Sequence, residues 1–505
     1  MTRWICLLAP LTIWCSPMTL HATPPQRVDE LDAYIETGLA DWKIPGLALA
    51  IVKDGEVVLC KGYGERDREQ GLPVDEDTLF AIASNSKLFT TTAISMLADE
   101  DALSWNDPVI KHVPRFRTAD PWMTENLTLE DMVTHRSGLR NSIRAWYGSG
   151  FSSQEILNRM PHMEISYRFR DGYHYHNIGY MIASLALENA SGRSWGAFVR
   201  ERIFEPLGME RSLTSESQLA AMENVSVPYA LVEEQLTPVR WYNLDNVGAC
   251  GAVISSAHDL AHWLRFRLNQ GAWHGERLLS EAAFTKIHTP QNTIPFGGDD
   301  DETILPYTTH QFYGLGVVIH DIKGKWVYEH GGNMDGQSSR IGVIPELGLG
   351  VAVLTNIDST LFQRALLYTV YDLYLGGESL DWSQRYLSHV EQNKQEDQER
   401  EAERKANRAT ETSPSLPLAQ YAGLYEHPLY GRVTIEHEED GLVFRYNDMG
   451  WYVGDLRHWH HDTFDAVMRY RYLGEWTLNF ELNSAGEPAS VYLDNLEVSF
   501  QRVDP

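Results

Sequence analysis

The pattern of apolar and polar residues predicts one helix and a hairpin at the start of the chain. Between residues 28 and 42, apolar side chains recur at helical spacing. Two short apolar runs follow at residues 47–52 and 56–60, separated by Asp54 and Gly55, a residue pair that favours a tight hairpin turn. A helix packed on an antiparallel hairpin is therefore the first predicted unit.

More strands and a closing helix are predicted far from this hairpin. Apolar runs indicate strands over residues 312–320, 325–330, 340–344 and 350–355, and a helix over residues 361–375. Between them, residues 98–260 alternate short helices and loops, including a capping-box helix at 128–135 and a largely helical stretch at 176–206. We therefore predict an α+β fold over residues 28–378, an α/β sandwich. Its antiparallel sheet is flanked by helices and split by an all-helical insertion.

The pattern changes again near the C-terminus. Residues 379–415 contain a charged run without an apolar period, which fits either a solvated helix or a linker. From residue 416 to residue 505 only strands are indicated, with period-two alternation and Gly- or Asn-rich turns. The runs lie at residues 433–435, 442–444, 476–480, 491–493 and 498–500. A small antiparallel β-barrel is the expected second domain.

Residues 1–22 have the pattern of a secretory signal peptide, with one positive charge at Arg3 and a mostly apolar run after it. A short membrane anchor is the alternative, but the run is shorter than the roughly 20 residues needed to span a bilayer. We expect cleavage and export to the periplasm or the medium of a bacterium. The net charge of −28 argues against nucleic acid or an anionic membrane as a partner.

Four cysteines are present, and Cys6 and Cys15 lie within the predicted signal peptide. Cys60 and Cys250 remain in the mature chain. Export permits a disulfide between them, but two cysteines cannot form a disulfide framework. A disulfide and two free thiols therefore both stay open.

Ser84 and Lys87 stand three residues apart where a helix is predicted to begin. A serine hydroxyl becomes a good nucleophile when a base takes its proton, and a lysine one turn away can be that base if its pKa is lowered. Backbone N–H groups at a helix start can also bind a developing oxyanion. An ordinary N-cap serine fits the same residues, so the assignment depends on partners elsewhere in the chain.

Two later segments offer such partners. Tyr175 and Asn177 lie on a predicted loop entering a helix, where a tyrosine can relay a proton and an asparagine can bind a substrate amide. His330 begins a His-Gly-Gly-Asn sequence at a strand end, where glycines allow a substrate to lie against the backbone. A surface loop and a tight turn with a structural histidine are the respective alternatives.

In this order, the motifs S-x-x-K at Ser84, Y-x-N at Tyr175 and H-G-G at His330 resemble those of the penicillin-recognising serine hydrolases. The similarity is to class C β-lactamases, D-aminopeptidases, DD-peptidases and family VIII esterases. Further stretches that fit are residues 134–139, 205–209 and 251–260. The resemblance covers about residues 28–376 and implies a β-lactamase/transpeptidase-like fold.

The resemblance also implies three catalytic roles. Ser84 would form the acyl-enzyme, and Lys87 would help to remove its proton. Tyr175 would pass a proton to the leaving group and activate the water that hydrolyses the acyl-enzyme. The implied activity is that of a serine hydrolase acting on a small amide or ester, with a D-amino-acid peptide favoured.

Four binding residues follow in the same way. Asn177, His330 and Gly332 would contact the substrate, and the N–H groups of Ser84 and Asn333 would form the oxyanion hole. No metal or organic cofactor is implied. A run of histidines at residues 458–461 has too few other ligands at suitable spacing to predict a metal site.

The third motif departs from the K-T-G of family β-lactamases, because His330 replaces a lysine that lies near the substrate carboxylate there. Strong β-lactamase activity is therefore not expected, although a β-lactamase proper and a carboxylesterase remain alternatives. A non-catalytic protein that binds cell-wall fragments is the rival class. The resemblance suggests that the C-terminal barrel is lipocalin-like, and the oligomeric state stays open.

Overall fold

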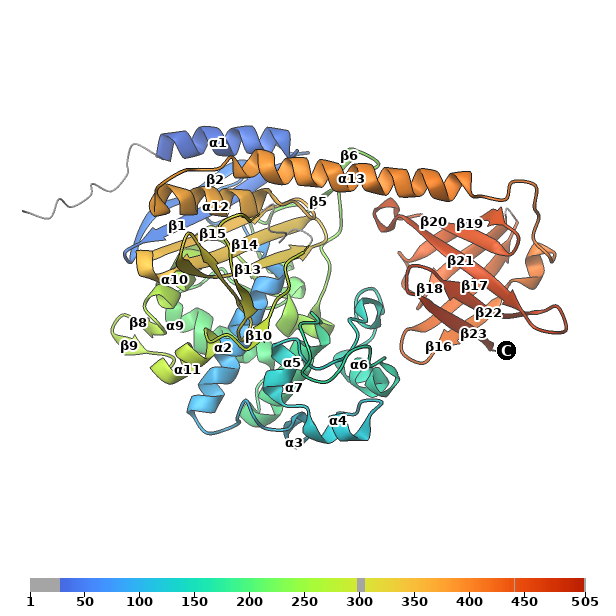
Figure 1. Cartoon of the computed structure of the whole chain (residues 1–505), viewed down its shortest axis with the longest axis horizontal. Helices are drawn as coiled ribbons and strands as arrows, with labels where there is room; N and C mark the ends of the chain where they lie inside the picture. Colours follow the sequence, from blue (N-terminus) through green and yellow to red (C-terminus); the bar gives the residue numbers. More distant parts are fainter. Residues whose placement is uncertain (1–27, 298–304, 440, 504–505) are drawn as a thin grey trace, which may run out of the picture.

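A nine-stranded antiparallel sheet organises the first part of the molecule (Figure 1). The computed structural model describes residues 28–297, 305–439 and 441–503, so the predicted signal peptide at 1–22 lies outside it. No helix in these ranges is both long and apolar enough to cross a membrane. In spatial order the strands are β10 (Asn292–Thr293), β11 (Gln311–Tyr313), β12 (Val318–Ile322), β13 (Lys325–Met334), β14 (Gln337–Ile344), β15 (Leu349–Thr355), β1 (Gly46–Lys53), β2 (Glu56–Asp67) and β3 (Leu72–Pro73).

Strand β1 pairs with both β2 and β15, so the first hairpin joins the late strands in one sheet. Its side chains alternate between two cores. Leu49 and Ile51 pack with α1 (Val28–Asp41) and α12 (Phe362–Leu375). Ala48 and Ala50 belong to the core on the opposite face, with residues of α10 (Ala257–Leu268). This arrangement confirms the predicted α/β sandwich, and we call residues 28–375 the sheet domain.

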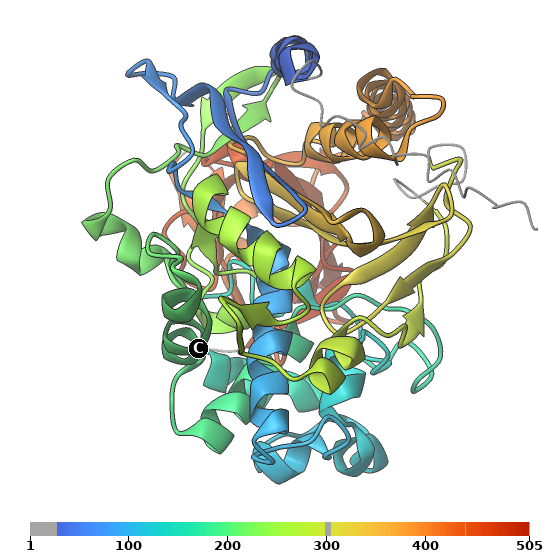
Figure 2. The ribbon, with the colours of Figure 1, turned by 90° about the vertical axis from the view of Figure 1, so that its left-hand side faces the viewer.

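Helix α2 (Ser86–Asp99) passes through the centre of the sheet domain (Figure 2). Every side chain from Ser86 to Leu97 is buried, so the helix is covered on all of its faces. Two of its buried threonines form hydrogen bonds with backbone carbonyl groups of the core. Thr90 donates to the carbonyl of Ala249 at 2.7 Å and Thr91 donates to the carbonyl of Leu315 at 2.8 Å. The helix is therefore held rigidly from all sides.

The expected helical insertion lies between β4 (Phe80–Ala81) and β10. Helix α5 begins with the predicted capping box, in which Thr128 and Asp131 bond reciprocally. Its helices are α3 (Val109–His112), α4 (Pro121–Asn126), α5 (Leu129–Val133), α6 (Ser153–Arg159), α7 (Ile178–Ser191), α8 (Trp195–Val199), α9 (Glu205–Leu207) and α11 (Glu281–Ile287), besides α2 and α10. Short strand pairs are β4 with β7 (Ile254–Ser255), β5 (Tyr229–Val232) with β6 (Gln235–Pro238) and β8 (Ala272–Trp273) with β9 (Glu276–Arg277).

The strand predicted over residues 312–320 is in fact two strands, β11 and β12. The chain turns at Gly316, whose φ of +78° favours glycine. A Cβ atom at this position would lie 2.9 Å from the carbonyl oxygen of Lys87. The break therefore brings the sheet edge against α2, a long-range contact that a local sequence pattern does not reveal.

The charged segment predicted as a solvated helix or a linker is a helix, α13 (Trp382–Ala406). Its first turns bury Trp382 and Tyr386 against α12, and the Trp382 indole donates to Asp372 at 2.8 Å. Beyond these turns its side chains are mostly exposed. Figure 1 shows α13 running from the sheet domain to the barrel.

The C-terminal part is a closed eight-stranded antiparallel barrel, which confirms the predicted antiparallel β-barrel. Its strands are β16 (Gly423–His427), β17 (Gly431–Glu438), β18 (Gly441–Tyr446), β19 (Val453–His460), β20 (Thr463–Met468), β21 (Glu475–Leu482), β22 (Pro488–Leu493) and β23 (Val498–Val503). Strands β16, β19 and β20 were not among the predicted runs. In β19, Gly, Asp, Arg and His residues hide the apolar alternation.

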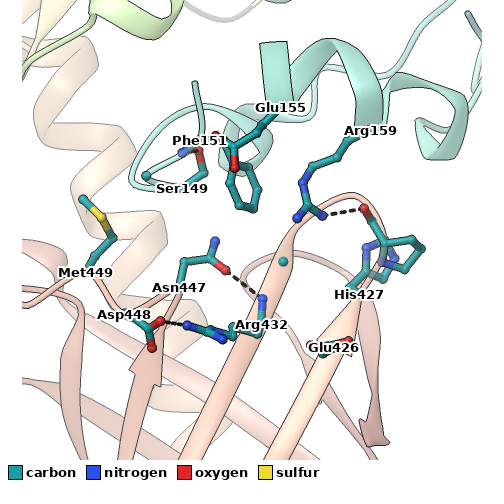
Figure 3. Close-up of a pocket in the computed structure, with 13 residues that line it drawn as sticks. Ser149, Phe151, Glu155, Arg159, Glu426, His427, Arg432, Asn447, Asp448 and Met449 are labelled. Atoms are coloured by element: carbon teal, nitrogen blue, oxygen red, sulfur yellow. Dashed lines mark hydrogen bonds and ion pairs between the residues drawn. The ribbon is translucent and has the colours of Figure 1, made fainter. Parts of the chain in front are cut away.

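The barrel docks on the sheet domain along a surface that we call the seam. Arg159 of α6 donates to the carbonyl of Pro428 at 2.7 Å, above a cavity of about 570 Å³ (Figure 3). The Arg144 guanidinium lies 5.1 Å from the ring centre of Trp476 in the barrel. On another part of the seam, Tyr472 donates to Asp358 at 2.7 Å. The two domains are thus joined by specific polar contacts.

Cys60 and Cys250 are both free thiols. Cys60 lies half-buried on β2, and its surroundings raise the pKa of its thiol to about 12, mainly through burial. Cys250 is fully buried behind α2. The sequence left a disulfide and two free thiols open, and the structure has two free thiols.

Candidate active site

Ser84 lies on a short 3₁₀ turn, Ala83–Asn85, between β4 and α2. The residue before it, Ala83, has a φ of +46°, a left-handed conformation that a residue with a Cβ atom rarely adopts. Neighbouring contacts hold the turn in place. Asn85 donates to Ser339 at 2.9 Å, and the Ser339 hydroxyl donates to the carbonyl of Ile82 at 2.8 Å. Such local strain persists where the surroundings enforce it, as at many functional sites.

Lys87 lies directly beside Ser84 and is fully buried. Its Nζ is 2.9 Å from Ser84 Oγ, 2.8 Å from Asn177 Oδ1 and 2.9 Å from the carbonyl oxygen of Cys250. These three acceptors match the three N–H bonds of an ammonium group. In the same geometry, a neutral amine can accept the proton of the serine hydroxyl. Lys87 is thus positioned for proton exchange with Ser84.

Tyr175 completes the contact on the other side of the nucleophile. Its hydroxyl lies 2.8 Å from Ser84 Oγ, and its ring centre lies 4.9 Å from Lys87 Nζ. Asn177 is the N-cap residue of α7. The structure therefore brings Ser84, Lys87, Tyr175 and Asn177 together, although up to 93 residues separate them in the chain.

The loop that carries Tyr175 is supported by the Thr-His-Arg-Ser-Gly stretch at residues 134–138. His135 Nδ1 accepts the N–H of His176 at 3.2 Å, and the His135 ring centre lies 4.3 Å from that of Tyr175. His176 in turn contacts the Ser137 hydroxyl at 2.9 Å. Burial lowers the pKa of His176 to about 4, so this side chain is neutral and structural near pH 7.

His330 lies at the same site but contributes no charge. Its Nδ1 is 2.6 Å from the carbonyl oxygen of Gly331, which can only accept, so Nδ1 carries the hydrogen. Its Nε2, 3.0 Å from the Tyr313 hydroxyl, accepts from that group. Burial, followed by the charge of Lys87, lowers the pKa of His330 to about 3. The imidazole is therefore neutral at physiological pH.

Gly332, the second residue after His330, was predicted to contact the substrate but packs against the backbone of the Ser84 turn. A Cβ atom on Gly332 would lie 2.2 Å from the carbonyl oxygen of Ile82 and 3.1 Å from Ala83 Cβ. Gly332 therefore lets β13 approach the turn that carries Ser84. Asn333, the next residue, is exposed and lines the same cavity as Ser84.

This cavity has a volume of about 640 Å³, and we call it the catalytic cavity. Ser84, Tyr175, Asn177, His330 and Asn333 line its inner end. Its walls also include Arg340, which forms an ion pair with the fully buried Glu329. Five of the seven predicted site residues thus line one concave site, whereas Lys87 and Gly332 are buried and do not line it.

At the outer end, Asp335 and Asp358 line the catalytic cavity together with Tyr472 of the barrel. The Tyr147 hydroxyl lies 2.7 and 2.6 Å from the two carboxylate oxygens of Asp335. Burial is the largest cause that raises the pKa of Asp335 to about 6. None of these residues was predicted from the sequence. Asp335 stands three residues after Gly332, a possible signal, whereas nothing local marks Tyr472.

No group of three or more His, Cys, Asp or Glu side chains suited to a metal ion occurs among the residues described. In the histidine run at 458–461, His458 Nε2 contacts the carbonyl of His461 at 2.9 Å. The chemistry available at the catalytic cavity is that of a serine, a lysine and a tyrosine.

Two family models and a curated protein match parts of this chain. A beta-lactamase family model matches residues 31–375, and a model of a domain of unknown function (DUF3471) matches residues 407–504. An unguisins hydrolase of Aspergillus campestris (strain IBT 28561) is 30% identical over 437 residues, covering 80% of this chain and 77% of that protein.

Two solved structures share the fold. An octameric penicillin-binding protein homologue from Pyrococcus abyssi is 24% identical, with a TM-score of 0.63, and the match covers 94% of this chain and 100% of that one. A D-stereospecific amidohydrolase from Streptomyces sp. is also 24% identical, with a TM-score of 0.56, and the match covers 70% of this chain and 100% of that one.

Proposed function

This chain belongs to the beta-lactamase family of serine hydrolases, and from that premise we propose that it cleaves a small amide or ester through an acyl-enzyme on Ser84. The observation that carries the proposal is the pair of contacts at Ser84 Oγ, 2.9 Å to Lys87 Nζ and 2.8 Å to the Tyr175 hydroxyl. A nucleophile held between two groups able to exchange protons is the arrangement that acyl transfer requires.

In the proposed reaction, Ser84 Oγ attacks the substrate carbonyl while Lys87 takes up its proton. The N–H groups of Ser84 and Asn333 stabilise the oxyanion. Tyr175 delivers a proton to the leaving amine or alcohol as its bond to the carbonyl carbon breaks. A water molecule then attacks the acyl carbonyl and gives a proton to the deprotonated Tyr175. As the bond to Ser84 Oγ breaks, Lys87 returns its proton to that oxygen, and the acid leaves.

The substrate class follows from the charge of the third motif. The neutral His330 offers no cation to a substrate carboxylate, which disfavours β-lactams that depend on a lysine there. A D-amino-acid amide or a short peptide is the favoured substrate, and the D-stereospecificity named for the Streptomyces relative supports this choice. Export to the periplasm or the medium is part of the proposal and rests on residues 1–22.

A fluorescent fluorophosphonate tests the nucleophile directly, because it labels activated serines. We expect the mature protein to be labelled and Ser84→Ala to be unlabelled. Ser95→Ala is the matched control, since Ser95 is buried on the same helix and its hydroxyl has no hydrogen-bond partner among the described residues. Its labelling should equal that of the unsubstituted protein.

A separate, unlabelled sample of the mature protein is then screened against D-aminoacyl amides, short-chain esters and a chromogenic cephalosporin. Preferred turnover of the amides supports the proposal, whereas preferred turnover of the cephalosporin indicates a β-lactamase proper. Labelling that persists in Ser84→Ala excludes Ser84 as the nucleophile. Absence of labelling and of turnover in both proteins favours the non-catalytic binding class.

A further inference from the structure

A second cavity adjoins the outer end of the catalytic cavity, at the seam between the sheet domain and the barrel. It has a volume of about 370 Å³. Tyr242 and Asp335 line both cavities, so they form the partition between them. At its other end, Phe151 and Met449 separate it from the cavity in Figure 3, where the two side chains come from opposite domains.

Five of the twelve residues that line this second cavity are aromatic, and we call it the aromatic chamber; its lining also includes the charged residues Glu216, Arg240 and Asp335. The sheet domain contributes Trp241 and Tyr242, and the barrel contributes Trp451 and Tyr470, all of them half-buried. The Tyr242 and Trp451 rings meet edge to face with centres 6.0 Å apart. Trp451 and Tyr470 meet in the same way at 6.3 Å. The chamber therefore exists only where the two domains meet.

Hydrogen bonds to the backbone fix the polar ends of these rings. Trp241 Nε1 donates to the carbonyl of Ser226 at 3.1 Å, and the Tyr470 hydroxyl accepts the N–H of Arg240 at 3.1 Å. The Tyr242 hydroxyl accepts the N–H of Gly148. Because the rings are already anchored, a ligand would pay little to order them. Such rings offer contacts to an apolar or aromatic group.

We propose that the aromatic chamber is an extended substrate subsite, which receives an aromatic or large apolar group remote from the bond that Ser84 attacks. Because Tyr242 and Asp335 line both cavities, the two sites are adjacent, and the proposed substrate extends past these side chains from one into the other. An apolar cavity of about 150 Å³ is enough for a benzene ring, so the chamber can hold one ring with its connecting chain. The proposal rests on the proposed function and adds a specificity role for the barrel.

The test uses two pairs of substrates with the full-length protein. The first pair is acetyl-D-alanine p-nitroanilide and 4-phenylbutanoyl-D-alanine p-nitroanilide, which differ on the acyl side. The second pair is D-alanine methylamide and D-alanine 4-phenylbutylamide, which differ on the leaving side. We expect kcat/KM to be at least about tenfold higher for the phenyl member of one pair, the scale of a well-filled apolar pocket.

Trp451→Ala and Tyr470→Ala then test where the phenyl group binds. We expect each to reduce the preference for the phenyl member to less than about threefold, mainly through KM. Trp326→Ala is the matched control, because Trp326 is exposed on β13 and lies outside both cavities. That variant should keep the full preference.

The outcomes separate this proposal from the proposed function. Hydrolysis of both members without preference, or a preference that survives both barrel substitutions, overturns the subsite. An equal loss on both members, with a lowered melting temperature, also overturns it, because the rings would then act only in docking. If the unsubstituted protein reacts with the fluorophosphonate in a parallel sample but hydrolyses none of the four substrates, the proposed amide substrate class is contradicted instead.

Discussion

The two ends of the catalytic cavity differ in which domains contribute their residues. At the inner end, Ser84, Lys87 and Tyr175 come from the sheet domain, and the lysine is fully buried with three acceptors. At the outer end, Asp335 bonds a tyrosine of its own domain and borders Tyr472 of the barrel. All residues of the proposed acyl-transfer chemistry therefore lie in the sheet domain. The outer end is lined by residues of both domains, which is where we propose that the substrate is selected.

Among the substitutions considered, one at Lys87 should reduce the activity of the inner end most severely. Lys87→Met keeps the apolar stem but removes the ammonium group, so the proposed base is lost. We expect kcat/KM to fall by about 10³-fold or more. The melting temperature should also fall, because Asn177 Oδ1 and the buried Cys250 carbonyl lose their donor. Near-normal turnover by a folded Lys87→Met protein would remove the lysine from the mechanism.

A smaller but still large effect is expected at Tyr175. Tyr175→Phe retains the ring against His135 and loses only the hydroxyl 2.8 Å from Ser84 Oγ. We expect kcat to fall about 100-fold, the typical contribution of a positioned acid or base. Tyr167→Phe, an exposed tyrosine of the preceding loop, is the control and should leave the rate unchanged. A kcat within about threefold of normal in Tyr175→Phe would exclude the proton relay.

The inner end was largely predictable from the sequence, and the outer end was not. Ser84, Tyr175 and His330 each begin a short motif, so their order in the chain could be compared with a known family. Tyr472 lies in a turn of the barrel with no motif around it. Its position depends on how two domains dock, a long-range property that no local pattern encodes.

The fold shows the same division. The split sheet followed from apolar runs such as residues 47–52, because a strand buried on both faces is continuously apolar. The left-handed Ala83 and the Gly332 contact with Ile82 could not be foreseen, since both result from packing between distant segments. The neutral state of His330 likewise depends on burial beside Lys87.

At the outer end of the catalytic cavity, Asp335 should make the stability of the protein depend on pH. The folded protein raises the pKa of Asp335 from 3.8 to about 6, so this carboxyl contributes most to stability below pH 4, and the contribution is lost as pH rises to 6. The shift corresponds to about 3 kcal/mol. Asp335→Asn cannot ionise, so its melting temperature should rise relative to the unsubstituted protein between pH 4 and 7. The exposed barrel variant Asp455→Asn should show no such relative rise.

Parallel pH profiles for Asp335→Asn and the unsubstituted protein would contradict this assignment. They would mean that water reaches Asp335 freely, and that the barrel does not seal the outer end as its contacts indicate. A relative rise accompanied by unchanged kcat for the short D-alanine methylamide would sharpen the comparison, because it would separate stability at the seam from chemistry at Ser84.

The smallest effect is expected at the strained turn of the inner end. Ala83→Gly relieves the left-handed backbone at φ +46° but makes the unfolded chain more flexible, so we expect a net stabilisation of only about 0.5 kcal/mol. Ala81→Gly, two residues earlier in strand β4, should instead destabilise by about 1 kcal/mol. Denaturant unfolding measures both. Equal destabilisation by the two glycines would show that Ala83 stores no strain, and that packing of its Cβ against β13 outweighs its backbone conformation.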